Sequence, residues 1–132
     1  MAINDLTADM LTRIRNAVRN REHSVTCISN KLNRGVAQVL VDEGYVHEFE
    51  NIDDGRQGLI RIKLKYGPRG EQVINNIDRV SKCGCRVYSG AKDLPRPLQG
   101  LGIAIVSTSS GVMSDQKCRA NAVGGEVVAL VT

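Results

Sequence analysis

The sequence of 132 residues predicts an α+β fold, and three patterns lead to this prediction. Apolar residues recur at helical spacing in two segments near the start of the chain. Two alternating segments then flank a turn signal, which is the pattern of a β-hairpin. The remaining sequence carries short β-branched or apolar runs and one brief helical segment, so the second half is predicted to be mostly β.

Residues 4–20 form the first predicted helix. Their apolar side chains fall on one arc of about 140° at ~100° per residue. Asn4 suits the N-cap position, and Asp5 suits the positive end of the helix. A polar and cationic strip lies opposite the apolar arc and consists of Thr12, Arg15, Asn16 and Arg19. The helix is therefore amphipathic.

A strand and a second helix follow. Residues 24–28 are short and β-branched, which favours a strand. Ser29 or Asn30 then caps a helix that continues through residue 43, because apolar residues recur there at helical spacing. Gly44 is the expected terminator of this helix.

A hairpin completes the first predicted unit. Residues 45–51 and 59–66 alternate on either side of an Asp-Asp-Gly turn at residues 53–55. The order α-β-α-β-β then closes a compact unit. The second strand directs one set of side chains to each face: Ile60, Ile62 and Leu64 to one, and Arg61, Lys63 and Lys65 to the other.

Gly67-Pro68-Arg69-Gly70 is the best candidate for a linker. We therefore expect two domains, residues 1–67 and residues 68–132. In the second domain the patterns predict strands at residues 73–81, 85–89, 102–106 and 126–131, a proline-bearing connection at 93–97, and one short helix at 114–121.

Charge is separated along the chain, although the net charge of +4 is modest. Residues 1–36 carry six basic and three acidic side chains, residues 37–55 none and six, residues 56–100 ten and three, and residues 101–132 two and two. Clustered Lys and Arg point to phosphate backbones as partners, whereas a solvated surface is the alternative for any one cluster. The separation of signs favours nucleic acid.

The sequence also indicates a compartment. No apolar stretch reaches the ~20 residues of a membrane span, and the start of the chain lacks the features of a secretory signal. Four cysteines (Cys27, Cys83, Cys85 and Cys118) are few and irregularly spaced, which favours reduced thiols over a disulfide framework. We therefore expect a cytoplasmic location, and the interior of an organelle is the alternative.

A run of hydroxyl residues follows one predicted buried strand: Ser107-Thr108-Ser109-Ser110, ending at Gly111. Hydroxyl groups both donate and accept, so a loop of small residues can meet ribose 2′-hydroxyls, phosphates and base edges at close range. Gly111 would let the backbone approach RNA without a Cβ in the way. An ordinary polar turn is the alternative.

Enzymatic and metal chemistry lack the spacing that they need. A hydrolase elbow, G-x-S-x-G, and a phosphate loop, G-x-x-x-x-G-K-[ST], are both absent, and no spacing links His23 or His47 to the serines. Cys83-Gly84-Cys85 lacks the second ligand pair of a zinc site and the C-x-x-C of a redox site. We expect no catalytic residue, no metal and no cofactor. A small serine hydrolase and a cysteine-based metal or redox module are the rival classes.

Four aromatic residues occur, and none is Trp, which leaves too few rings for a single-strand stacking platform. Recognition should instead rely on the backbone, sugars and minor-groove shape of a folded RNA helix. Tyr88, near Arg86 in a basic β-rich region, is the candidate for one stacked ring; a half-buried strand tyrosine is the alternative.

Three stretches of sequence are specific enough to suggest a family. Residues 8–16 read ADMLTRIRN, residues 100–109 read GLGIAIVSTS and lead to GVMSD, and GGE follows at residues 124–126. In this order and spacing they resemble the small-subunit ribosomal protein S8 family of bacterial type. The likeness runs from Asp5 to the last residues, nearly the whole chain.

The resemblance implies a fold and a function. The N-terminal domain would resemble double-stranded RNA-binding modules and pack on a β-rich C-terminal domain with one short helix. The protein would bind the central domain of small-subunit ribosomal RNA early in assembly, contact neighbouring ribosomal proteins, and repress its own synthesis through a mimic of that RNA fold in messenger RNA. The acidic stretch from Asp42 to Asp54 should avoid phosphate and is the expected protein contact.

The resemblance also implies particular contact residues. The principal RNA contact would comprise Ser107, Thr108, Ser109, Tyr88 and Glu126, with Gly111 and Gly125 beside them, and a second RNA segment would meet Thr12, Arg13, Asn16 and Lys31. Glu126 could accept from a base amine or a 2′-hydroxyl, or brace the serine loop, and both interpretations stay open. This chain departs from the family at Ser110, where a basic residue is common, and at Cys83-Gly84-Cys85, which replaces a turn containing proline and leucine.

Overall fold

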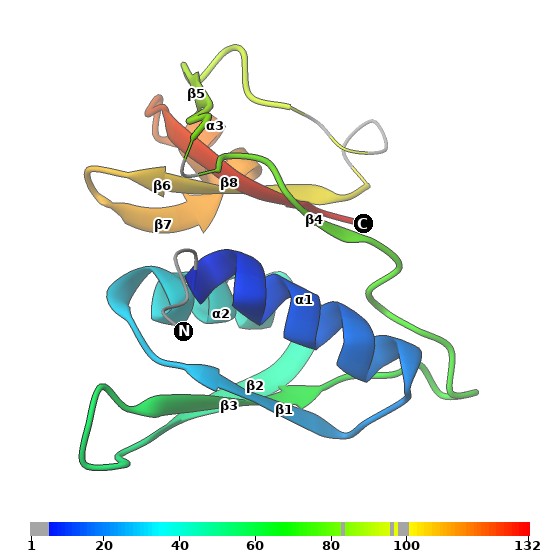
Figure 1. Ribbon diagram of the computed structural model, residues 1–132. Coiled ribbons are helices and arrows are strands. Elements are labelled where there is room, and N and C mark those ends of the chain that lie inside the picture. Colours follow the sequence, from blue (N-terminus) through cyan, green and yellow to red (C-terminus); the bar gives the residue numbers. More distant parts are fainter. Residues whose placement is uncertain (1–5, 83, 96, 98–100) are drawn as a thin grey trace. The chain divides into compact units, whose positions relative to one another are not determined.

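The computed structural model describes residues 6–82, 84–95, 97 and 101–132. The chain divides into two compact units, Met1–Asn75 and Asn76–Thr132, which we call unit 1 and unit 2. Both contain helix and antiparallel sheet (Figure 1), so the predicted α+β class is confirmed. The division into domains 1–67 and 68–132 stays a prediction. Within the described residues no helix has the length and apolar character that a membrane crossing requires.

Unit 1 begins with helix α1 (Leu6–Arg19). Its inner face is formed by the apolar residues that the helical period selects, and Met10, Leu11 and Ile14 are fully buried. The period of 3.6 residues thus predicts the buried side of this helix correctly. The expected N-cap, Asn4, and the neighbouring Asp5 lie outside the described residues.

Helix α2 (Lys31–Asp42) is capped by Asn30, whose side-chain oxygen accepts from the amide of Asn33 at 2.7 Å. This bond satisfies an N–H that the first helical turn leaves without a partner, and it decides between Ser29 and Asn30. The helix ends before Gly44, which adopts the left-handed φ of +79° that favours glycine.

A buried asparagine that the pattern did not predict joins three elements of unit 1. Asn33 is fully buried in α2 and accepts from the Thr7 hydroxyl of α1 at 2.9 Å. Its amide donates to the carbonyl of Ile28, the last residue of β1, at 2.9 Å. The buried amide is thus satisfied and fixes how α1, α2 and β1 meet.

The sheet of unit 1 has the order β1-β3-β2, with β1 (Ser24–Ile28), β2 (Val46–Ile52) and β3 (Leu59–Leu64) all antiparallel. Helices α1 and α2 cover one face of it (Figure 1). Ile60, Ile62 and Leu64 are buried, whereas Arg61 and Lys63 are exposed. The alternation predicted for β3 is therefore confirmed.

The segment predicted as a linker is hydrogen-bonded within unit 1. The amide of Gly67 donates to the carbonyl of Glu71 at 2.8 Å, and the guanidinium of Arg21 donates to the carbonyl of Gly70. Gln72 pairs with Tyr66 and donates to the carbonyl of Val18. These bonds hold residues 67–72 against the end of α1.

Unit 2 is built on an antiparallel sheet whose central strand is the last in the chain. The order is β4-β8-β6-β7, and β5 pairs with β8 beyond the end of β4. The strands are β4 (Ile77–Arg79), β5 (Tyr88–Ser89), β6 (Ile103–Thr108), β7 (Gly111–Ser114) and β8 (Gly125–Val131). Strand β8 therefore joins every other strand except β7.

Helix α3 (Asp115–Ala120) covers part of this sheet. Ser114 caps it by accepting from the amide of Lys117 at 3.3 Å. Asp115 is fully buried, where it pairs with Arg119 and accepts from the amide of Ala104 at 3.1 Å. The helix contributes Cys118 to one core cluster, whose other members are Leu94, Ala104, Val106, Met113 and Val127.

The strands of unit 2 differ from the predicted ones in four places. The strands expected at 73–81 and 85–89 shrink to three and two residues. Strand β7 was not predicted at all. Strand β6 continues to Thr108, so Ser107 and Thr108 are strand residues and the loop starts at Ser109.

Candidate nucleic-acid interface

The structure brings three sequence-distant candidates into one row across unit 2. Glu126 of β8 lies opposite Tyr88 of β5 on one side and opposite Ser107 of β6 on the other. Residues directly opposite in antiparallel strands project to the same face of the sheet. The adjacent Val106 and Val127 belong to the core cluster, so alternation directs the row to the opposite face. We call these three residues the recognition row.

The recognition row depends on glycines at the start of β8. A Cβ on Gly125 would overlap the carbonyl oxygen of Ser107, and a Cβ on Gly124 would overlap that of Ser89. No other residue type lets three backbones approach this closely. Gly125 was a candidate contact residue, and its geometry gives it the role of a spacer between β8 and β6.

A two-residue turn, Ser109-Ser110, joins β6 to β7. The Thr108 hydroxyl accepts from the amide of Ser110 at 3.1 Å and donates to the carbonyl of Gly111 at 2.7 Å. Gly111 has a φ of +119°, which a side chain would strain. The Thr108 hydroxyl therefore organises the turn from within, whereas Ser109 and Ser110 are exposed.

Glu126 is held in place by two donors. The Ser81 hydroxyl donates to Glu126 Oε2 at 2.6 Å, and the guanidinium of Arg86 donates to the same oxygen at 3.1 Å. Only 17% of the Glu126 side chain is exposed, against 45% for Arg86. The carboxylate is thus bound on its protein side and has a cation beside it.

Tyr88 is the most exposed member of the recognition row. It is 71% exposed, whereas the next residue, Ser89, is half-buried. Of the two sequence interpretations, the half-buried strand tyrosine is therefore wrong. An aromatic ring that is open to solvent beside hydroxyl groups is a surface on which a base or a ribose can pack.

The candidates on α1 present a simpler surface. Thr12, Arg13 and Asn16 are all exposed on one side of the helix. The Thr12 hydroxyl donates to the carbonyl of Ala8 at 2.9 Å, and Arg13 pairs with Asp9 at 2.8 Å, which raises the pKa of Arg13. These bonds lie within one helix and at its surface, so an incoming phosphate can replace them at little cost.

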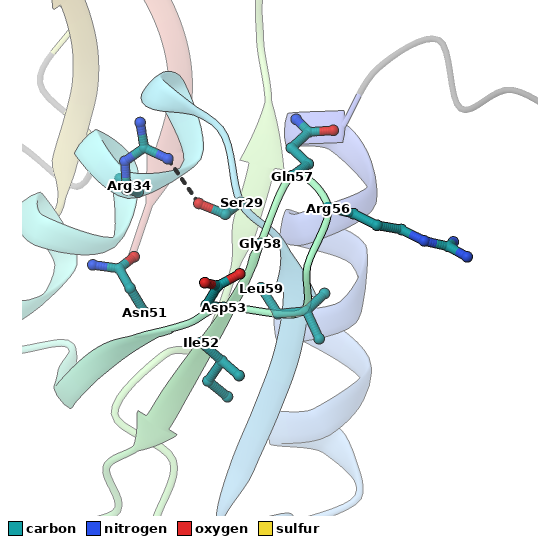
Figure 2. A pocket seen from close by; sticks show the side chains of 9 residues that line it. All are labelled: Ser29, Arg34, Asn51, Ile52, Asp53, Arg56, Gln57, Gly58 and Leu59. Atoms are coloured by element: carbon teal, nitrogen blue, oxygen red, sulfur yellow. Dashed lines mark hydrogen bonds between the residues drawn. The ribbon is translucent and has the colours of Figure 1, made fainter.

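Lys31 is the first residue of α2 and is exposed. A pocket of about 390 Å³ lies at this end of the helix, between the residues before α2 and the β2–β3 turn (Figure 2). Arg34 points to Ser29 and donates to its hydroxyl at 2.8 Å, whereas Arg56 points away from the pocket. Asp53 also lines it. Because Arg56 points away from the pocket and the carboxylate of Asp53 lines it, this pocket is poorly suited to bind an anion.

The outer face of the sheet in unit 1 carries charges that are already paired. Lys63 contacts Glu48 at 2.8 Å and Arg61 contacts Glu50 at 3.3 Å. The hydrogen bond to Lys63 lowers the pKa of Glu48, and the same bond raises the pKa of Lys63. To contact an RNA backbone, these two cations must exchange a carboxylate for a phosphate.

The cysteines of the described residues do not form a metal site. Cys27 and Cys118 are buried, Cys85 is exposed, and all three are free thiols; Cys83 lies outside the described residues. Burial raises the pKa of Cys27 to about 11 and also raises that of Cys118. In the part of the chain that the structure describes, no three potential ligands cluster around a common point.

The serine turn has no base beside it within the described residues. His23 and His47 line an open pocket of about 570 Å³ in unit 1, together with Arg61 and Lys63. No hydrogen bond joins a histidine or a carboxylate to Ser109 or Ser110 among the bonds of the described residues. Activation of a serine nucleophile needs such a base.

Comparison with known proteins decides the family. The family model described as ribosomal protein S8 matches residues 5–132. The chain belongs to the ribosomal protein S8 family. It is 52% identical over 131 residues to the small ribosomal subunit protein uS8 of Caldicellulosiruptor bescii, covering 99% of each chain. The proteins of the same name from Acetivibrio thermocellus and Streptococcus suis are each 50% identical over 131 residues, again covering 99% of each chain.

Family membership confirms the resemblance read from the motifs, and the structure adds residues of this S8-family chain that the motifs missed. Ser81 and Arg86 both bind Glu126, yet they lie 45 and 40 positions before it. No local pattern links residues so far apart. The one feature of the sequence that could have pointed to Ser81 was its position at the end of a predicted strand, just before a tight turn.

Proposed function

We propose that this chain is a structural component of the small ribosomal subunit that binds the central domain of small-subunit ribosomal RNA and directs subunit assembly. Membership of the ribosomal protein S8 family supports the ribosomal role. The observation that carries the RNA-binding part is the recognition row, in which a tyrosine, a carboxylate and a serine from three strands share one face. No bond is made or broken in this function.

The groups of the recognition row suit the wide, shallow minor groove of an RNA helix. Small hydroxyl side chains at Ser107 and Ser109 can reach 2′-hydroxyls and base edges without steric hindrance. Tyr88 offers a ring to stack or pack against a sugar. Glu126 accepts but does not donate, so it selects a base amine or a 2′-hydroxyl over a phosphate. Together these contacts read the shape of a folded RNA.

Cations supply the part of the affinity that does not depend on RNA sequence. The exposed residues Arg13 and Lys31 of unit 1 are the proposed contacts to a second RNA segment, together with Thr12 and Asn16. The proposed likeness of unit 1 to double-stranded RNA-binding modules would give it recognition of RNA largely by shape. The acidic stretch from Asp42 to Asp54 is the proposed contact for a neighbouring ribosomal protein.

Binding acts on assembly by population shift. The protein prefers the folded RNA to the unfolded RNA, and it can stabilise the folded form only by that difference in affinity. A messenger RNA that folds into the same shape would compete for the same residues. Feedback repression of ribosomal-protein synthesis is therefore part of the proposal, and it needs no second site.

The test is a titration of the purified chain with a central-domain ribosomal RNA fragment, with transfer RNA as competitor. We expect specific binding to be tighter than nonspecific binding by at least 10³-fold, as is usual for specific nucleic-acid complexes. Sedimentation of a cell lysate should place the chain with small ribosomal subunits. Equal affinity for both RNAs, or absence from the subunit fraction, would overturn the proposed function.

A further inference from the structure

Two segments pair with the same edge of β8: one ends at Ser81, and the other begins at Val87 and includes Tyr88. The side chain of Ser81 lies in the gap between these two segments. The first segment stops pairing with β8 after Ser81, whose amide donates to the carbonyl of Val127 at 3.1 Å. The second segment begins at Val87, whose carbonyl accepts from the amide of Val127 at 2.9 Å. Between these points Lys82 and Cys85 exchange two backbone hydrogen bonds of 3.0 Å each, which close a tight hairpin.

The Ser81 hydroxyl lies in this gap with its direction fixed. Ser81 is fully buried, and its oxygen accepts from the amide of Val87 at 3.1 Å. A hydroxyl has one proton to give. With a lone pair engaged by Val87, that proton is donated to Glu126 Oε2 at 2.6 Å, a charge-assisted bond of the strong class.

The two donors occupy one side of the Glu126 carboxylate. Ser81 and Arg86 both bind Oε2, and within the described residues Oε1 makes no hydrogen bond. The carboxylate therefore has one oxygen satisfied by the protein and one oxygen left to accept. Arg86 also places a positive charge 3.1 Å from it, which offsets the repulsion that an RNA backbone would otherwise meet.

We propose that Ser81 is a positioning residue of the RNA surface: it orients Glu126 so that Oε1 accepts from a donor of the RNA, a base amine or a 2′-hydroxyl. This inference rests on the proposed function. Among the described residues, the groups that bind the Glu126 carboxylate are Ser81 and Arg86 rather than the serine turn. This favours contact with RNA over bracing of the turn as the role of Glu126.

The first test is the Ser81→Ala variant, titrated with the ribosomal RNA fragment and with transfer RNA. Loss of one hydrogen bond to a charged group should weaken specific binding about tenfold and leave the affinity for transfer RNA unchanged. The matched control is Ser114→Ala, which also removes a buried hydroxyl from unit 2, by deleting the cap of α3. It should lower the melting temperature comparably and leave RNA affinity unchanged.

The second test asks whether Ser81 acts through Glu126. In a Glu126→Ala background, Ser81→Ala should weaken specific binding less than about twofold, because residues in one network are not additive. A structural role alone would give the same loss in both backgrounds. A full tenfold loss in the Glu126→Ala background would therefore overturn the inference, as would parental affinity of Ser81→Ala.

Two further outcomes are distinguishable. If the parent chain shows no preference for the ribosomal RNA fragment, the proposed function fails, and the inference fails with it. If Ser81→Ala does not fold, Ser81→Cys keeps the size of the side chain and a weaker donor. The specific RNA affinity of Ser81→Cys should lie between those of the parent and Glu126→Ala. If folded Ser81→Cys binds as tightly as the parent, the inference is contradicted.

Discussion

The two units place their candidate residues in different ways. In unit 2, Ser107, Tyr88 and Glu126 come from three strands and are fixed by pairing, by a glycine spacer and by a buried serine. In unit 1, Thr12 and Arg13 lie on the exposed face of one helix, and their hydrogen bonds among the described residues stay within that helix.

This difference teaches how shape recognition and charge can be divided within one small chain. A preorganised surface loses little freedom on binding, so its contacts can discriminate between RNA shapes. Exposed side chains with replaceable partners supply attraction that depends on salt more than on sequence. We expect variants of unit 2 to lose specificity, and variants of the unit 1 surface to lose affinity uniformly.

The largest effect is expected from Gly125→Ala. The added Cβ would overlap the carbonyl of Ser107, so β8 and β6 must separate and the recognition row is broken. We expect specific RNA affinity to fall by on the order of 100-fold and unfolding free energy to fall by about 1–3 kcal/mol, the usual cost of overpacking. RNA titration and thermal unfolding measure the two changes.

The matched control is Gly84→Ala in the same unit. A Cβ there has open space around it, and both quantities should stay near those of the parent. Parental RNA affinity of a folded Gly125→Ala chain would contradict the idea that close strand approach builds the surface.

The next effect concerns the buried thiol of Cys27 in unit 1, whose ionisation should change the free energy of unfolding but not the RNA affinity. Burial raises the pKa of Cys27 from 9.0 to about 11, so above pH 9 the unfolded chain loses this proton while the folded chain keeps it. Stability is therefore complete below pH 9 and falls as pH rises to 11, by about 2 kcal/mol. Denaturant unfolding at stepped pH measures this slope.

Cys27→Ala provides the comparison for that measurement. It removes the ionisable group, so the remaining slope between pH 9 and 11 should be shallower than in the parent, with Cys118 still contributing. An identical slope in both proteins would show that Cys27 does not stay protonated in the folded chain.

A smaller effect is expected from Ser109→Ala, which removes one exposed hydroxyl from the turn. Specific affinity should fall about fivefold, the value of one hydrogen bond near 1 kcal/mol, and the melting temperature should not change. Ser24→Ala, an exposed serine of unit 1, is the control. Equal affinity of Ser109→Ala and parent for the ribosomal RNA fragment would remove the turn from the proposed contact.

The smallest effect should come from the paired cations. Lys63→Ala should weaken binding to all RNAs alike and reduce the log–log salt slope by at most ~0.9. Glu48→Gln frees Lys63 from its carboxylate and should strengthen binding slightly at low salt. A selective loss of ribosomal RNA binding in Lys63→Ala would contradict the assignment of specificity to unit 2.

Local periodicity predicted most of unit 1 because its elements are long enough to repeat. Residues 24–28 were predicted as a strand and are one, and the second helix ends before Gly44 as expected. Asn33 was missed because an apolar pattern gives no reason to bury an amide. Its burial is satisfied by groups 26 positions away on Thr7, which no local window contains.

Unit 2 was harder to predict because its strands are short and held by distant partners. Tyr88 and Ser89 form a strand only because β8 pairs with them. Strand β7 follows a two-residue turn, and the apolar pair Val112 and Met113 in it was too short to recognise. Motifs identified Ser109 and Glu126 as candidates. The role proposed for Ser81 could not be predicted, because it depends on how two segments pair with β8, a strand more than 40 positions later in the sequence.

The position of β8 has a consequence for synthesis. This strand is made after all the others, and it alone links β5 to β6. A nascent polypeptide that stops before Gly125 lacks the strand that aligns Tyr88 with Ser107. Premature products would thus lack the recognition row, a consequence that follows from the order of translation alone.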